Sequence, residues 1–234
     1  MCVVLMGGAW AAAQDVAVTG QVELLDASIG ATASSASGAV VWLTPVTGTP
    51  AAAATTAPPP AHGLRLVQHN KSFEPHVLVV PVGSVVEFPN RDPFFHNVFS
   101  LFEGKRFDLG LYEAGSTRNV HFDRPGISYI FCNIHPEMSA VVIALETPYY
   151  AVSDRRGEIL IPGVPPDRYL FRVWHQSSLP EALNGLSHEI TVSQTGSSLG
   201  VIRLTQTTLP RTHKNKYGRD YDRVAPPSPV YENP

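Results

Sequence analysis

The chain has 234 residues, of which 44% are hydrophobic and 16% are charged, and its formal net charge is −3. This length allows one large domain or two small ones, and the hydrophobic content is ample for a core. The near-neutral charge argues against nucleic acid as a partner. A low charged fraction with frequent proline and glycine favours short strands joined by turns over helices.

The first segment, residues 1–13, is predicted to be a secretory signal. An apolar run from Cys2 to Ala13 ends in small residues before Gln14, as the hydrophobic region and cleavage site of a signal do. The run is too short to span a membrane, and no transmembrane segment is expected elsewhere. The basic residues that normally begin a signal are missing, so the signal is either truncated or atypical; an ordinary N-terminal strand is the alternative. Export predicts a periplasmic or extracellular location.

Two strands are expected next, over residues 16–25 and 39–43. Residues 47–63 consist largely of Thr, Pro and Ala, a composition that cannot bury enough apolar surface to fold alone. This segment is predicted to be an extended linker.

The middle of the chain alternates between strands and turns. Residues 82–88 have the pattern of a strand and residues 90–93, Asn-Arg-Asp-Pro, that of a turn. Residues 127–131 form a second alternating run, and residues 140–145 an apolar return strand. Any chemistry is therefore expected at the strand ends and in the loop between the last two strands.

Four side chains at these places form a metal-ligand set. His96 follows the turn, and Cys132, His135 and Met138 lie in Cys-Asn-Ile-His-Pro-Glu-Met, where Pro136 stiffens the loop. A trigonal His₂Cys plane with a long axial Met is the ligand set of a blue copper electron-transfer site. If the signal is removed, Cys132 is the only thiol left, and a lone cysteine in an exported protein needs a role other than an internal disulfide.

Other readings of this set are weaker. Structural zinc sites take four strong nitrogen or sulfur ligands, and methionine is not among them. A two-copper purple centre would need a second cysteine in the same loop. For Cys-x₂-His alone, a buried apolar cysteine beside a surface histidine would be an equally good explanation.

Residues 64–146 resemble a cupredoxin, and the Cys-x₂-His-x₂-Met loop is similar to the short ligand loop of amicyanin. The resemblance implies a Greek-key β-sandwich with one type 1 copper ion held by His96, Cys132, His135 and Met138. It also implies that the backbone N–H of Asn97 points at the thiolate. Residues 101–116 depart from a minimal amicyanin and either shape a partner surface or extend the sheet. The matching positions are Asn70, Phe73, Pro75, Gly83, Val86, Phe88, Asn90, Asp92, His96, Asn97 and Val98.

The two flanks resemble a second family, the transthyretin-like domain found beside carboxypeptidases. Neither flank alone has enough strands for a stable sandwich, so we expect residues 15–46 and 147–206 to form one discontinuous β-sandwich with the cupredoxin inserted. We expect this domain to serve as a scaffold or docking surface. The matching positions are Gly20, Val22, Gly38, Ala39, Val41, Asp154, Gly157, Gly163, Pro165, Pro166 and Tyr169, whereas Asp167 replaces a glycine of the family motif.

The remaining histidines and the end of the chain complete the prediction. His69, His76, His121 and His175 are expected to have surface, structural or contact roles. Residues 207–234 are polar and proline-rich and are predicted to be an extended tail, ordered only against another surface.

The predicted protein is thus all-β and is an exported copper protein that carries single electrons between redox partners such as a cytochrome or a dehydrogenase. Docking to a larger assembly would use the second domain or the tail. An enzyme is not expected, because an oxidase or reductase would need further copper ligands, typically several His-x-His pairs. Copper storage or delivery, or a structural exported β-protein, are the alternatives.

Overall fold

The computed structural model describes residues 15–26, 36–47, 63–101, 103–207 and 212–221. Their regular structure is almost entirely β-strand, which confirms the all-β class predicted from the sequence. The predicted signal, residues 1–13, and residues 48–62 of the predicted linker lie outside the described residues. Among the described helices, none is long and apolar enough to cross a membrane.

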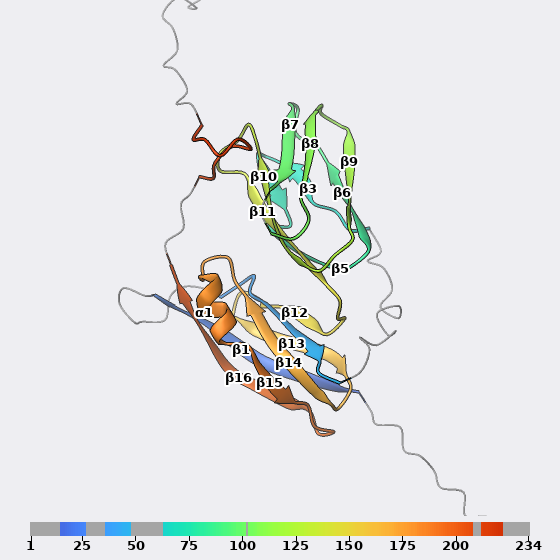
Figure 1. The fold of residues 1–234 in the computed structure, drawn as a ribbon, viewed down its shortest axis with the longest axis vertical. Coiled ribbons are helices and arrows are strands. Elements are labelled where there is room, and N and C mark those ends of the chain that lie inside the picture. Colours follow the sequence, from blue (N-terminus) through green and yellow to red (C-terminus); the bar gives the residue numbers. More distant parts are fainter. Residues whose placement is uncertain (1–14, 27–35, 48–62, 102, 208–211, 222–234) are drawn as a thin grey trace, which may run out of the picture. The chain divides into compact units, whose positions relative to one another are not determined.

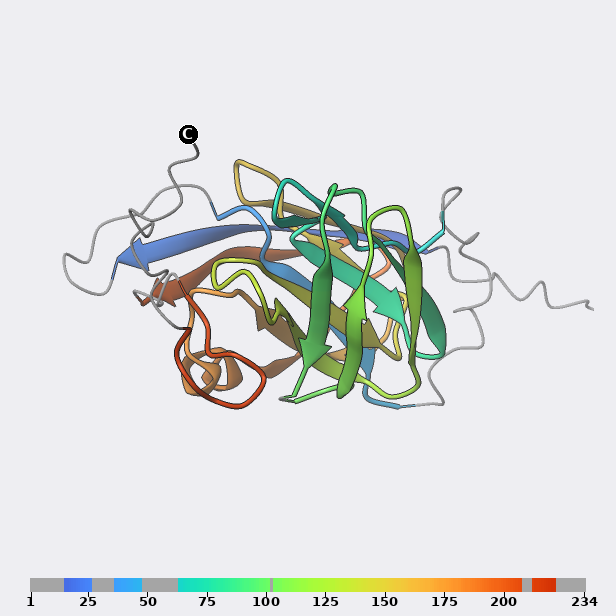
Figure 2. The same cartoon turned by 90° about the horizontal axis from the view of Figure 1, so that it is seen from above.

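The chain divides into two compact units, which can be followed by colour in Figures 1 and 2. The first, here called the flank unit, comprises Met1–Ala57 and Thr147–Leu209. The second, here called the central unit, comprises Pro58–Glu146 and Pro210–Pro234. The chain therefore passes from the first unit to the second, returns to the first, and ends in the second.

Each sheet of the flank unit combines strands from both sides of the central unit. One sheet has the order β13-β1-β16, with β1 antiparallel to β13 and parallel to β16; the other has the order β12-β2-β14-β15. A side-chain hydrogen bond also links the two flanking segments, because Thr147 Oγ1 donates to the Leu43 carbonyl at 2.7 Å. The strands are β1 (Val16–Asp26), β2 (Val40–Pro45), β12 (Tyr150–Val152), β13 (Glu158–Val164), β14 (Arg168–Trp174), β15 (His188–Thr191) and β16 (Ser197–Gln206).

The turn between β12 and β13 depends on Asp154 and Gly157. The Asp154 carboxylate accepts hydrogen bonds from the backbone N–H groups of Arg156 and Glu158. Gly157 has φ of +79°, and a Cβ at this position would lie 2.2 Å from the Val22 carbonyl oxygen. A side chain is therefore excluded both by the backbone conformation and by the neighbouring strand.

One element of this unit was missed by the sequence analysis. Helix α1 (Pro180–Gly185) follows β14, with proline at its start and Leu183 as its buried residue. A helix of six residues is too short to show a hydrophobic period, and its proline and glycine indicate a turn as readily as a helix.

The central unit contains a five-stranded sheet in the order β5-β11-β10-β7-β8 and two-stranded sheets β6-β9 and β3-β4. A cluster of buried residues forms a core among the described residues of this unit and includes Val86, Phe88, Ile130 and Val142. The strands are β3 (Val67–His69), β4 (Ser72–Glu74), β5 (Val77–Pro81), β6 (Ser84–Pro89), β7 (His96–Ser100), β8 (Phe107–Tyr112), β9 (Thr117–Phe122), β10 (Gly126–Cys132) and β11 (Ser139–Leu145).

Two details of this unit bear on the arrangement of its strands. Pro75 and His76 separate β4 from β5, and Pro75 has no backbone N–H to donate to a sheet. The segment 101–116, left open between a partner surface and an extension of the sheet, contains β8, which pairs with β7. It therefore extends the sheet.

Candidate metal centre

Two neighbouring strands bring the first two candidate ligands together. His96 begins β7 and Cys132 ends β10, and these strands are antiparallel neighbours in which Cys132 lies opposite Val98. Both His96 and Cys132 are fully buried. The convergence of residues 36 positions apart thus follows from the pairing of β7 with β10.

The loop after β10, residues 133–138 (here called the ligand loop), turns back toward the same point. Cys132 N–H donates to the Met138 carbonyl at 3.2 Å, and Met138 N–H donates to the His135 carbonyl at 3.1 Å. Asn133 N–H donates to the Asn97 carbonyl at 2.8 Å, which ties the loop to β7. These backbone bonds place His135 on the same side as Cys132.

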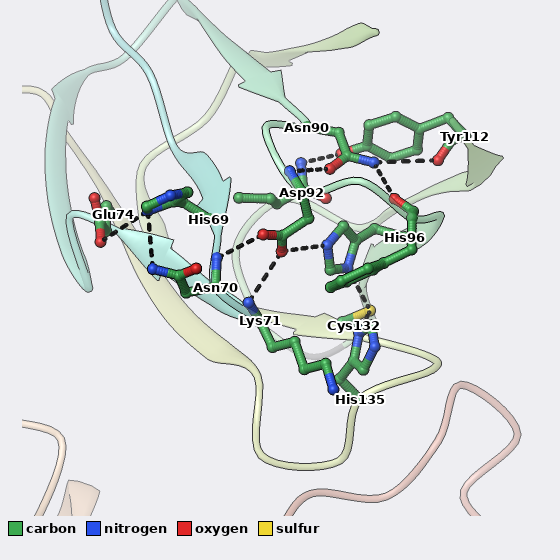
Figure 3. Close-up of polar contacts among 12 residues, drawn as sticks. His69, Asn70, Lys71, Glu74, Asn90, Asp92, His96, Tyr112, Cys132 and His135 are labelled. Atoms are coloured by element: carbon green, nitrogen blue, oxygen red, sulfur yellow. Dashed lines mark hydrogen bonds and ion pairs between the residues drawn. The ribbon is translucent and has the colours of Figure 1, made fainter. Parts of the chain in front are cut away.

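Three of the four predicted ligands meet directly. Nδ1 of His96 and Nδ1 of His135 each lie 3.5 Å from Sγ of Cys132, and the three ligand atoms are within 4.8 Å of one another. Figure 3 shows both imidazole rings beside the sulfur. The fourth, Met138, is 1% exposed and belongs to the same buried cluster as Cys132.

Asp92 fixes the orientation of His96. Its Oδ2 lies 2.9 Å from Nε2 of His96, and its carboxylate also accepts from the backbone N–H groups of Asn70 and Lys71 (Figure 3). With Nε2–H donated to the carboxylate, Nδ1 is the nitrogen that faces Cys132. Sequence reasoning matched Asp92 to a family position but did not assign this role; its four-residue spacing from His96 was the available signal.

The surroundings of the sulfur favour the thiolate. Burial by itself would raise the pKa of Cys132, but the His96 ring and three backbone N–H groups outweigh burial and lower it. One of these N–H groups belongs to Asn97, as the resemblance implied. A lowered thiol pKa favours the form that binds metals.

The two histidines differ in their electrostatics. Burial would lower the pKa of His96, but its contacts with Cys132 and Asp92 raise it. Burial, followed by the nearby positive charges of His96 and Lys71, lowers the pKa of His135 and keeps that ring neutral. A neutral imidazole is the state that donates a lone pair to a metal.

The donor set fits a single small metal ion. Nitrogen and sulfur ligands at about 2.0 to 2.3 Å from a shared ion, at angles between tetrahedral and trigonal, stand about 3.5 to 3.8 Å apart. The observed separation of 3.5 Å between each Nδ1 and Sγ matches this range. A thiolate with two imidazoles suits copper by its ligand softness.

The other histidines discussed from the sequence have different surroundings. His69 lies 3.9 Å from the Glu74 carboxylate, His76 contacts the Ser139 carbonyl, and His121 contacts the Gly83 carbonyl. His175 is buried in the flank unit, where its Nδ1 contacts Ser177 Oγ at 2.8 Å.

Comparison with known proteins gives matches among solved structures only: no family model and no curated protein matches the chain. A novel purple cupredoxin from Nitrosopumilus maritimus is 23% identical, with a TM-score of 0.33, over 35% of this chain and 99% of that one. An oxidized amicyanin mutant is 21% identical, with a TM-score of 0.34, over 44% of this chain and 99% of that one.

A copper-containing nitrite reductase from Thermus scotoductus SA-01 is 28% identical, with a TM-score of 0.35, over 42% of this chain and 25% of that one. The chain therefore spans about a quarter of the reductase.

Proposed function

We propose that this protein is an exported type 1 copper protein that carries single electrons between redox partners and is not an enzyme. The observation that supports it best is the approach of both Nδ1 atoms to the buried sulfur of Cys132 at 3.5 Å. A copper ion bound there supplies a one-electron couple between Cu(I) and Cu(II). His96, Cys132, His135 and Met138 are the proposed ligands.

The protein's own contribution is to hold the ligand side chains in place and to shield two of them from water. His96 and Cys132 are fully buried, and Asp92 holds the His96 ring through Nε2. Ligands that cannot relax limit the rearrangement that accompanies a change of charge, and rapid electron transfer depends on a small rearrangement. Met138 adds a thioether, whose softness favours the reduced ion.

His135 is the proposed exit for the electron. Its ring is half-buried and packs against Phe94 with ring centroids 5.5 Å apart. The neighbouring Ile134 and Phe95 are 42% and 52% exposed. A small apolar surface of this kind suits the weak contacts that redox proteins such as a cytochrome or a dehydrogenase make.

The test is the visible spectrum and redox behaviour of the copper-loaded full chain. We expect intense absorption toward the red end of the visible range and reversible one-electron oxidation. Cys132→Ala and His96→Asn should abolish both, whereas His121→Asn, a change of an exposed histidine on β9, should leave both intact. Copper that binds without this absorption would contradict the proposal, and rapid loss of copper to a chelator would point to storage or delivery instead.

We further propose that the flank unit is a transthyretin-like sandwich that serves as scaffold or docking surface. The support is the interleaving of its strands, because β1 pairs with β13 and β16 from the opposite end of the chain. Deleting residues 64–146 and joining the flanks by a short linker tests it. A folded product is expected, and failure of the flanks to associate would contradict the proposal.

A further inference from the structure

The end of the described chain, residues 212–221 (here called the strap), lies against the ligand loop of the central unit. It is the red segment beside the end of β10 in Figure 1. These residues belong to the segment predicted to be an extended tail, ordered only against another surface. They make hydrogen bonds with the segment that carries the candidate ligands.

His213 and Tyr221 bind backbone carbonyls at and beside these ligands. His213 N–H donates to the Pro136 carbonyl at 3.0 Å, and its Nε2 lies 3.3 Å from the His135 carbonyl. The Tyr221 hydroxyl donates to the Cys132 carbonyl at 2.8 Å. The strap thus supplies protein donors to the carbonyls of Pro136 and Cys132, and its His213 ring lies at the His135 carbonyl, which also accepts from Met138 N–H.

Ring packing and a second anchor hold the strap in place. The His213 ring packs on Phe131 with centroids 4.4 Å apart. Lys216 N–H donates to Asn133 Oδ1 at 2.9 Å, and its ammonium pairs with Asp108 at 2.8 Å. Asp108 in turn accepts from the Asn97 side chain, so the anchor reaches the residue after His96.

We propose that the strap positions the ligand loop, with His213 and Tyr221 as its positioning residues. The inference rests on the proposed copper function and adds that a segment about 80 residues beyond the ligand loop supports the site. Loops after strands are normally mobile, and a metal site needs its ligands held by supporting contacts. By fixing the carbonyls of Cys132 and His135, the strap keeps the donor atoms of these residues at their observed separation.

The first test uses the metal-free full chain. Tyr221→Phe and His213→Phe each remove a hydrogen bond but keep a ring, and backbone amide exchange is read at Asn133 and Met138. We expect exchange roughly two- to tenfold faster per bond removed, the equivalent of one net hydrogen bond. The matched control is Tyr217→Phe, because Tyr217 is 73% exposed and its ring contacts Lys216 of the strap itself.

The second test uses the copper-loaded variants and reads the reduction potential, the visible spectrum and the rate of copper loss to a chelator. Tyr221→Phe should shift the potential and speed copper loss, with Tyr217→Phe unchanged. If amide exchange and the reduction potential are unaltered in variants that still show the visible absorption, the proposed role of the strap is wrong and the proposed function is unaffected. Faster loop exchange in a chain that never binds copper would instead overturn the proposed function.

Discussion

Replacing Asp92 with asparagine is the sharpest single perturbation of the candidate centre. The change keeps the size of the side chain but removes its charge and turns one acceptor atom into a donor. In the native chain the carboxylate is 3% exposed and accepts from the His96 ring and from the backbone N–H groups of Asn70 and Lys71. An asparagine amide cannot satisfy all three donors at once.

The expected cost has two parts. Asparagine still accepts from one backbone N–H, so the free energy of unfolding should fall by about 1 to 3 kcal/mol, the cost of one buried donor left without a partner. Without the carboxylate, Nε2–H of His96 keeps at most a neutral amide oxygen as its acceptor, so the hydrogen bond that orients the ring weakens. Loss of such a supporting partner lowers metal affinity by roughly 10- to 100-fold, or about 1.4 to 2.7 kcal/mol.

Copper(II) affinity is measured by competition with a chelator of known affinity, and stability by denaturant unfolding of the metal-free protein. The matched control is Asp123→Asn, which removes an exposed carboxylate whose partner is Lys105 at 2.9 Å. This control should bind copper as the native chain does. An Asp92→Asn variant with native copper affinity and spectrum would refute the role assigned to the carboxylate.

Three further outcomes are expected. Met138→Leu should shift the reduction potential while copper stays bound, and an unchanged potential in voltammetry would remove the thioether from the axial role. Gly157→Ala should lower the melting temperature of the flank unit much more than Gly163→Ala does. Both glycines have a positive φ, which costs a residue with a Cβ about 1 to 2 kcal/mol, but only at Gly157 would the added Cβ lie 2.2 Å from a carbonyl oxygen. Burial would raise the pKa of Asp108, yet Lys216 and other donors lower it below 3.8, while Asp108 raises the pKa of Lys216 above 10.5. This ion pair therefore contributes to stability between pH 3.8 and pH 10.5. The contribution is lost as the pH falls through the lowered carboxyl pKa or rises through the raised ammonium pKa. Denaturant unfolding as a function of pH should show both losses in the native chain and neither in Asp108→Asn.

The strands and the ligand types follow from local sequence. Runs of β-branched and aromatic residues mark β6, β10 and β13 as strands, and buried positions alternate with more exposed ones along much of each strand. The order Cys-x₂-His-x₂-Met after β10 identifies three donors in one loop, and an isolated histidine after a turn supplies the fourth candidate.

Other features depend on segments that are distant in the sequence. The parallel pairing of β1 with β16 and the contact of Tyr221 with the Cys132 carbonyl join residues whose local patterns carry no sign of their partners. A polar residue in a turn or a tail satisfies its hydrogen bonds equally well with water. Sequence therefore determined which side chains are the candidate ligands, whereas the tertiary structure decided what holds them, because only packing removes the water with which those groups would otherwise bond.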